Sequence, residues 1–278
     1  MHRSCFDLRR LMIPLFLLGC IAHASPSDAH YLTASGCSVS NVGYLTDLAK
    51  EYERRTGEKV FVRGGGTILG IEDLRSGKVD FAASCRGRIT GDPADIRFIQ
   101  VAWDALAFIV NKRNPVSNIT LNQVRAIYSG RITNWKQLHG PDAPIKVFIS
   151  RSRRGLSGVE ISTMAMVLNG KEPVNTPDTV FLASTGIVEQ MVEETQDGFA
   201  ATGFSSARKR DVKMLKVNGV FPTQKTIITK RYPLKRPLFL VVSSTPKPEV
   251  RRFVDFVLSR EGQKFISSRG GVSLFDVR

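Results

Sequence analysis

Three loops of this chain combine glycine with hydroxyl or arginine side chains, which is a combination that can bind an anion. They span residues 36–40, 64–67 and 153–158, and each lies between a predicted strand and a predicted helix. At such a junction, free backbone N–H groups point outward with the positive end of the helix dipole. One such loop is weak evidence, since Ser and Gly also cap helices for structural reasons. Three in one chain predict an anion site.

The candidate ligand groups of these loops are hydroxyls, backbone amides and a guanidinium. The hydroxyls of Ser38, Thr67 and Ser157 can donate hydrogen bonds to an anion, and an arginine such as Arg153 can donate two at once. Glycine lets the backbone approach the anion closely. The set is completed by two neighbours in the same loops, Val39 and Gly158.

Motifs for catalysis, nucleotides and metals do not stand out in the sequence. Residues 64–70 lack the full G-x-G-x-x-G spacing, and neither a Walker motif nor a G-x-S-x-G elbow occurs. His30 and His139 have no metal-ligand spacing. We expect Asp80 and Asp104 to serve as caps or contacts between lobes. The chain is therefore predicted not to be an enzyme, with no catalytic residue, cofactor or metal.

Alternating strands and helices must position the three loops. Strands are predicted at residues 31–35, 59–63, 79–84, 145–149, 199–204 and 237–242, and helices at 45–57, 68–75, 121–128, 158–168, 186–194 and 250–268. This alternation predicts an α/β fold with a mainly parallel sheet. No Pro/Gly/Ser-rich linker separates two domains, which favours lobes joined by crossing strands.

The first 24 residues are predicted to be a secretory signal peptide rather than part of the fold. A basic start precedes the apolar run Leu11–Ala22, and a small-x-small signature ends at Ala24. We expect cleavage after Ala24 and a periplasmic or extracytoplasmic mature protein. A lipoprotein cleavage box ending at Cys20, a twin-arginine signal at residues 9–10 and an uncleaved anchor helix are the alternatives.

The chain is strongly basic. It has 40 Lys and Arg against 25 Asp and Glu, a formal net charge of +15. Such a charge favours an anionic partner: an oxyanion, an anionic membrane surface or an acidic protein. No basic helix with interleaved aromatic residues occurs, so we expect no nucleic-acid partner.

Several stretches of the sequence resemble the phosphate-binding (PstS-like) family of periplasmic solute-binding proteins. They are residues 64–86, Ile127–Trp135, 167–171, Tyr232–Leu238 and 256–263, and the similarity extends over about residues 31–275. The resemblance implies a two-lobed type II periplasmic-binding-protein fold, with mixed, mainly parallel sheets and helices on both faces. Lobe 1 would comprise residues 25–107 and 240–278, and lobe 2 residues 108–239, with ligand in the cleft and closure by a hinge.

The resemblance also implies a function. The chain would be an exported, monomeric solute-binding protein that binds a small oxyanion, phosphate or phosphate-like, and delivers it to the permease of an ABC transporter. The alternative is a sensor, scaffold or surface-attachment protein that reuses the fold, since a fold does not fix function.

Two stretches depart from the family pattern. In the segment Arg-x-x-Gly-Ser-Gly-Thr, Arg153, Ser157 and Gly158 match, while Leu156 and Val159 replace Gly and Thr. In the second stretch, the family commonly has an acid just after the serine that ends a strand.

At that second place this chain has Cys85 and Arg86 after Ser84. A thiol is a poor hydrogen-bond acceptor compared with a carboxylate, so the identity of the anion stays open. Cys85 and Arg86 remain candidate ligand residues, and Arg86 and Arg88 would add charge for a larger or fully deprotonated anion.

The resemblance further suggests a disulfide. Cys37 and Cys85 are the two cysteines outside the predicted signal peptide. In the resembled fold, strands 1 and 3 are neighbours, and these cysteines follow strands 1 and 3. A Cys37–Cys85 disulfide is therefore predicted. Free buried thiols, or a metal or redox site, are the alternatives.

Overall fold

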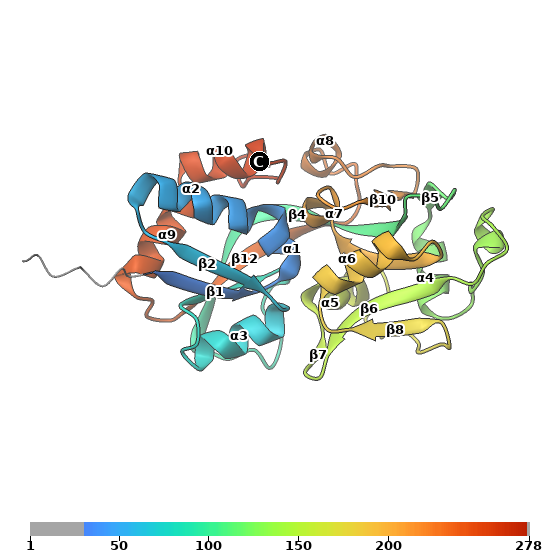
Figure 1. Cartoon of the computed structure of the whole chain (residues 1–278), viewed down its shortest axis with the longest axis horizontal. Coiled ribbons are helices and arrows are strands. Elements are labelled where there is room, and N and C mark those ends of the chain that lie inside the picture. Colours follow the sequence, from blue (N-terminus) through green and yellow to red (C-terminus); the bar gives the residue numbers. More distant parts are fainter. Residues whose placement is uncertain (1–30, 277–278) are drawn as a thin grey trace, which may run out of the picture. The chain divides into compact units, whose positions relative to one another are not determined.

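In the computed structural model, which describes residues 31–276, a mixed ten-stranded sheet runs through the chain (Figure 1). The predicted signal peptide, residues 1–24, lies outside the described residues. The strands of the sheet are β1 (Leu32–Gly36), β2 (Val60–Gly64), β3 (Phe81–Ser84), β4 (Ile96–Asn111), β6 (Lys146–Ser152), β7 (Gly155–Leu156), β8 (Thr179–Leu182), β9 (Gly198–Gly203), β10 (Val212–Met214) and β12 (Lys235–Ser243). A separate two-stranded sheet consists of β5 (Asn118–Ile119) and β11 (Lys216–Val217).

Two sets of parallel strands flank a long antiparallel pair. In the first strand group, β1 lies between β2 and β3 and is parallel to both. In the second strand group, β6 is parallel to β8 and β9. Between the groups, β12 runs antiparallel to β4 over residues 235–243. The predicted α/β architecture is confirmed, with parallel order inside each group and antiparallel pairs where β4 and β12 join them.

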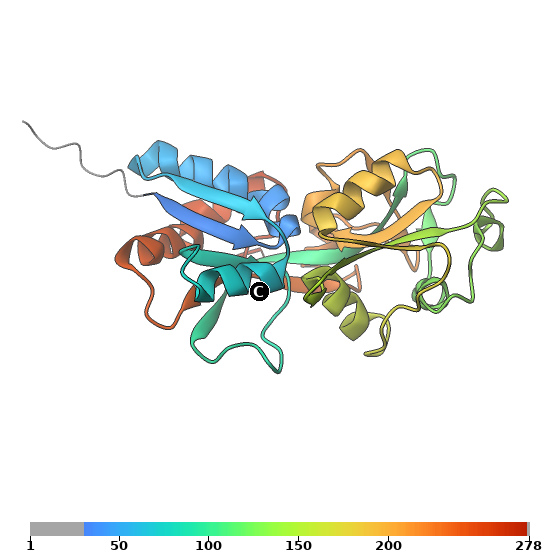
Figure 2. The same ribbon diagram turned by 60° about the horizontal axis from the view of Figure 1, so that its bottom comes forward.

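Helices cover both faces of the sheet. They are α1 (Ser38–Ser40), α2 (Thr46–Thr56), α3 (Thr67–Arg75), α4 (Leu121–Tyr128), α5 (Gly158–Met166), α6 (Thr185–Glu194), α7 (Phe204–Ala207), α8 (Gln224–Ile228), α9 (Pro248–Leu258) and α10 (Arg260–Ser268), with a π-helical turn at Asn41–Leu45 and a 3-10 turn at Trp135–Leu138. At the first strand group, α2 and α3 lie on opposite faces (Figures 1 and 2).

The alternation of β3 explains this two-sided packing, because successive strand residues point to opposite faces. Phe81 and Ala83 belong to the core cluster that contains Leu48 of α2. Ala82 between them packs with Ile71 of α3 instead. A strand buried on both faces must be apolar throughout, and all four residues of β3 are buried.

The C-terminal helix differs from its prediction. Residues 250–268 were expected to form one helix, but α9 ends at Leu258 and α10 begins at Arg260. Ser259 between them is extended (φ −63°, ψ 161°), and its hydroxyl accepts a hydrogen bond from the Gly262 N–H. This serine cap starts a new helix, while both helices keep an apolar face toward the core.

The predicted lobe limits fall inside continuous strands. The limit at residues 107/108 lies within β4, and the limit at 239/240 lies within β12. The division into lobes stays a prediction. Among residues 31–276, no helix has the length and apolar character needed to cross a membrane.

Candidate functional site

The carboxyl ends of the two strand groups meet in the middle of the sheet (Figure 1). A Cβ added to Gly158, the first residue of α5, would lie 2.7 Å from Thr67 Oγ1 and 2.9 Å from Cys85 Sγ. A Cβ added to Gly186 in α6 would lie 3.5 Å from Ser38 Cβ. The loops that follow β1, β2 and β3 therefore pack directly against the first turns of α5 and α6.

The residues at this junction form what we call the strand-end cluster: Ser38, Thr67, Cys85, Ser157 and Gly158. All five are buried. All five were predicted as ligand residues, and the structure brings them together from loops far apart in the sequence. Val39, also predicted, is buried beside them and packs against Gly203 at the start of α7.

The helices that begin at the strand-end cluster differ in their caps. Ser157 caps α5 by accepting a hydrogen bond from the Glu160 N–H, and Ser184 caps α6 in the same way. The N-cap residues of α1 and α3, Cys37 and Gly66, make no side-chain cap hydrogen bond. Neither N-cap residue thus offers a hydroxyl or carboxylate acceptor to the first turn of α1 or α3, which suits a bound anion.

The hydroxyls on the two sides of the cluster also differ. Ser157 Oγ hydrogen-bonds to Ser150 Oγ, and Thr185 Oγ1 lies 3.1 Å from Ser150 Oγ. The Ser38 hydroxyl has no hydrogen-bond partner among residues 31–276. Ser150 and Thr185 were not predicted from the sequence, although each lies where a strand ends or a helix begins, the rule that identified Ser157.

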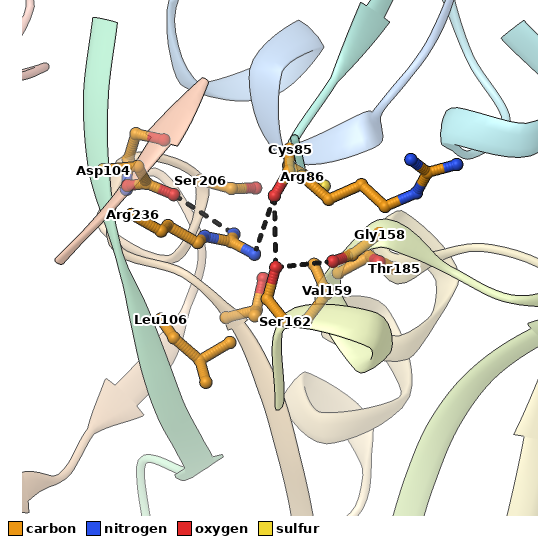
Figure 3. A network of polar contacts seen from close by, with 12 residues as sticks. Cys85, Arg86, Asp104, Leu106, Gly158, Val159, Ser162, Thr185, Ser206 and Arg236 are labelled. Carbon is orange, nitrogen blue, oxygen red and sulfur yellow. Dashed lines mark hydrogen bonds and ion pairs between the residues drawn. The ribbon is translucent and has the colours of Figure 1, made fainter. Parts of the chain in front are cut away.

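A buried ion pair links the crossing strands to the cluster (Figure 3). Arg236 Nη2 of β12 lies 3.2 Å from Asp104 Oδ2 of β4, and both side chains are almost fully buried. Asp104 Oδ1 also accepts a hydrogen bond of 2.9 Å from the Ser205 N–H. Arg236 and Ser162 both donate to the Cys85 carbonyl, at 3.5 and 3.3 Å. Asp104 thus serves as a contact and cap, as predicted.

The predicted Cys37–Cys85 disulfide is not formed in this structure, in which both cysteines are buried free thiols. The strand order behind the prediction is correct: β1 pairs with β3, and the Cys37 N–H donates to the Ala83 carbonyl. Adjacent strands bring the thiols close but do not join them. The hydrogen bond from Cys37, which outweighs burial and is aided by the charge of Arg236, lowers the pKa of Cys85 to about 7.

The arginines predicted to bind the anion lie outside the cluster or are already paired. Arg86 forms two hydrogen bonds to the Asp92 carboxylate, at 2.6 and 2.8 Å, in a buried pair. Arg88 donates to backbone carbonyls at the start of β4. Carboxylate and carbonyl groups thus accept from Nη donors of both arginines, while Arg86 Nε has no partner among the described residues. That Arg86 and Arg88 offer charge to an anion stays a prediction. Arg153 is exposed on the β6–β7 hairpin and does not belong to the buried cluster.

A buried acid in α5 was not predicted. Glu160 is fully buried; its Oε1 accepts a hydrogen bond of 3.2 Å from the Ser150 N–H, while Oε2 has no partner among the described residues. Burial raises the pKa of Glu160 to about 8. The acid is therefore mostly protonated at neutral pH, and it adds little negative charge near the cluster.

The space between the loops is small in this conformation. A cavity of about 10 Å³ lies between the loop at residues 65–69 and the hairpin around Ser152 and Ser157. That volume holds about one water molecule. An oxyanion with four oxygen atoms needs the loops to move apart.

Comparison with known proteins identifies the family. Residues 22–261 match the PBP superfamily domain. The chain belongs to the PBP superfamily. Among relatives with a curated name, it is 27% identical to the phosphate-binding protein PstS of Borreliella burgdorferi, over 95% of this chain and 98% of that protein. It is 31% identical to protein SphX of Synechococcus elongatus, over 78% of this chain and 70% of that protein.

Solved structures show the same PBP superfamily fold. One from Clostridium perfringens, described as a phosphate ABC transporter substrate-binding protein with bound phosphate, has a TM-score of 0.78 and 26% identity, covering 88% of this chain and all of that chain. An ABC-type phosphate transport receptor from Vibrio cholerae has a TM-score of 0.65 and 28% identity, with the same coverage of both chains. The predicted family and type II fold are confirmed, and the chain is a solute-binding protein, not an enzyme.

Proposed function

We propose that this PBP superfamily chain binds phosphate, or an oxyanion like it, at the strand-end cluster and delivers it to an ABC transporter. One observation carries the proposal: helix first turns without side-chain caps, those of α1 and α3, open into the junction between the two strand groups. The phosphate named in the C. perfringens and V. cholerae descriptions supports this ligand class.

The chemistry of the cluster fits an anion. Backbone N–H groups at the starts of α1 and α3 and the unpaired Ser38 hydroxyl are donors that lack a protein acceptor. The nearby Glu160 is mostly neutral because burial raises its pKa to about 8. The net charge of +15 attracts anions over a longer range.

We further propose that binding involves a hinge between lobes 25–107 plus 240–278 and 108–239. The strands β4 and β12 cross between these lobes and would carry the bend. Opening would separate Gly158 from Thr67 and Cys85, whose present packing leaves room for about one water molecule. Closure on the anion would then restore contacts such as the hydrogen bond from Ser162 to the Cys85 carbonyl.

The location proposed for the mature chain is outside the cytoplasm. Residues 1–24 would act as a signal peptide cleaved after Ala24, and the named ABC-transport relatives are consistent with an exported receptor. Mass spectrometry of the exported protein gives the cleavage site. A lipid-modified Cys20 at the new N-terminus would instead identify a lipoprotein.

Thermal unfolding with added anions tests the proposed function. The purified exported protein is heated with phosphate, arsenate, sulfate or molybdate, each at millimolar concentration. A ligand at 100 times its Kd stabilises a protein by about 2.7 kcal/mol, so the bound anion raises the Tm by several degrees. Absence of a shift with every anion contradicts the proposal and favours a sensor or scaffold role.

A matched pair of variants locates the site. Ser38→Ala removes the unpaired hydroxyl of the cluster, and we expect it to weaken anion binding by about tenfold, the value of one hydrogen bond to a charged group. Ser117→Ala changes an exposed serine elsewhere and serves as the control. Equal anion affinity in both variants places the site away from α1.

A further inference from the structure

A second, larger cavity opens beside the strand-end cluster. Its volume is about 660 Å³, and we call it the outer cavity. It shares Gly65, Leu69, Ser152 and Ala183 with the small cavity between the loops. An occupant of the strand-end cluster would therefore extend directly into it.

The walls of the outer cavity combine apolar and basic side chains. The residues that matter here are Leu69, Phe181, Ile187, Arg151, Arg153 and Arg154. Ile187 is 40% exposed, although it is a large apolar residue in the first turn of α6. The Arg151 guanidinium lies 4.9 Å from the centre of the Phe181 ring. This pair offers a flat, partly apolar surface, of the kind on which a planar group stacks.

Of the three arginines that line the outer cavity, one carries a positive charge that no acidic group offsets. Arg151 is paired with Glu172, and Arg154 is paired with Glu72 of α3. Arg153 has no partner among residues 31–276. One uncompensated guanidinium thus faces a cavity that also exposes apolar surface.

The size of the outer cavity exceeds what a free oxyanion can use. Small-molecule sites have volumes of about 300–1,000 Å³ and are mostly apolar with a few polar groups, and 660 Å³ lies inside that range. A bare oxyanion has no apolar part to bury against Leu69 or Ile187. A ligand that fits both places carries an anionic group and a flat apolar group.

We propose that the ligand of this protein is a phosphate monoester with a flat apolar substituent. The phosphate group binds at the strand-end cluster, and the substituent lies in the outer cavity against Phe181 and Ile187. Arg153 adds a positive charge near the ester. The inference rests on the proposed oxyanion function and deepens it by naming a larger substrate class.

Calorimetric titration of the exported, purified protein with inorganic phosphate, methyl phosphate and phenyl phosphate tests this inference. Methyl and phenyl phosphate carry the same anionic group and differ in apolar area. We expect phenyl phosphate to bind at least about tenfold more tightly than methyl phosphate, because the ring leaves water. Equal or weaker binding of phenyl phosphate overturns the inference.

Two pairs of variants connect that preference to the outer cavity. Ile187→Gln is expected to reduce the ratio of phenyl to methyl phosphate affinity by about fivefold or more, while Ile89→Gln, at a 41% exposed isoleucine elsewhere, preserves it. Arg153→Gln is expected to weaken phenyl phosphate binding several-fold relative to Arg231→Gln, which changes another exposed arginine. An unchanged ratio in Ile187→Gln contradicts the placement of the ring.

The outcomes separate the two proposals. Binding of inorganic phosphate without a preference for phenyl phosphate leaves the proposed function standing and overturns the monoester. Absence of binding by all three compounds overturns both.

Discussion

The four helices that begin at the strand-end cluster fall into two kinds. On the side of the first strand group, α1 and α3 start without a side-chain cap. On the side of the second strand group, α5 and α6 start at Ser157 and Ser184, whose hydroxyls accept hydrogen bonds from the first turns. The same local motif, a loop before a helix, thus lacks a side-chain cap on the first side, which we call the open side. On the second side, which we call the closing side, a serine caps the helix.

Under the proposed function, this difference predicts that the first side holds the anion and that the second side closes over it. A helix start whose N–H groups already have a hydroxyl acceptor gains less from an anion than one without. Glycines complete the closing side: Gly158 and Gly186 bring α5 and α6 against the loops of the first strand group. We therefore expect changes at the helix starts of the first side to affect mainly anion binding, and changes at the serine caps and closing glycines of the second side to affect mainly stability.

The largest expected effect comes from the ion pair that joins both sides. Arg236→Met leaves the fully buried Asp104 carboxylate without its cation, which costs about 3–5 kcal/mol of unfolding free energy. Chemical denaturation measures this loss. The double variant with Asp104→Asn removes the unpaired charge and keeps an acceptor for the Ser205 N–H, so it is expected to recover much of the loss.

A loss below about 1 kcal/mol in Arg236→Met would contradict the role of the pair. It would show that Asp104 is stabilised by other groups, such as the Ser205 N–H.

The second effect is a pH dependence on the closing side. The pKa of Glu160 is about 8 in the folded protein and about 4.3 in an unfolded chain. Between these values the folded state binds more protons than the unfolded state, so stability falls as pH rises from about 4 to 8. Glu160→Gln removes this term and is expected to be more stable than the wild type at pH 8, by about 2–4 kcal/mol.

Urea unfolding at pH 5, 6.5 and 8 measures the difference. Glu194→Gln, at an exposed glutamate in α6, is the matched control and should follow the wild-type profile. Parallel profiles for the wild type and Glu160→Gln would mean that Glu160 is ionised when folded.

The sequence predicted the local features that come together at the strand-end cluster. A glycine or hydroxyl between a strand and a helix is visible over a few residues, and the loops containing Ser38, Thr67 and Ser157 meet as expected. The serine that separates α9 from α10 was equally local: Ser259 caps the Gly262 N–H. This break between the two helices was missed because the apolar periodicity of the sequence continues from α9 into α10. The pairing of Arg86 with Asp92 was also missed, although the two residues are only six apart in the sequence.

The rest of the site depends on contacts that no local pattern contains. Arg236 and Asp104 are 132 residues apart and face each other only through the register of β12 on β4. Glu160 looks like an ordinary helix-start acid in the sequence, and its raised pKa follows from the burial of its side chain. Cys37 and Cys85 follow neighbouring strands, as predicted, yet both are free thiols in the structure. The order of the strands alone therefore does not determine whether a disulfide forms.

A third effect compares the two closing glycines. In Gly158→Ala the new methyl group lies under 3.0 Å from Thr67 Oγ1 and Cys85 Sγ, so the loops must shift, at a cost of about 1–3 kcal/mol. In Gly186→Ala the nearest contact is 3.5 Å, an ordinary distance, and alanine favours the helix by up to about 1 kcal/mol. Thermal unfolding should therefore shift the Tm in opposite directions. A fall of equal size in both variants would show that α5 and α6 pack equally tightly.

The smallest effect on stability is expected from a matched pair of serines, Ser157 on the closing side and Ser38 on the open side. Ser157→Ala removes the cap of α5 and the hydrogen bond to Ser150, and should cost about 1–2 kcal/mol. Ser38→Ala removes a hydroxyl without a partner among the described residues, and should change the unfolding free energy by less than about 0.5 kcal/mol. Denaturant unfolding without added anion measures both. If Ser38→Ala destabilises the protein as much as Ser157→Ala does, then its hydroxyl serves the fold. The Ser38 hydroxyl would then have a hydrogen-bond partner within the protein, as the Ser157 hydroxyl does. The proposed difference between a side that holds the anion and a side that closes over it would fail at Ser38.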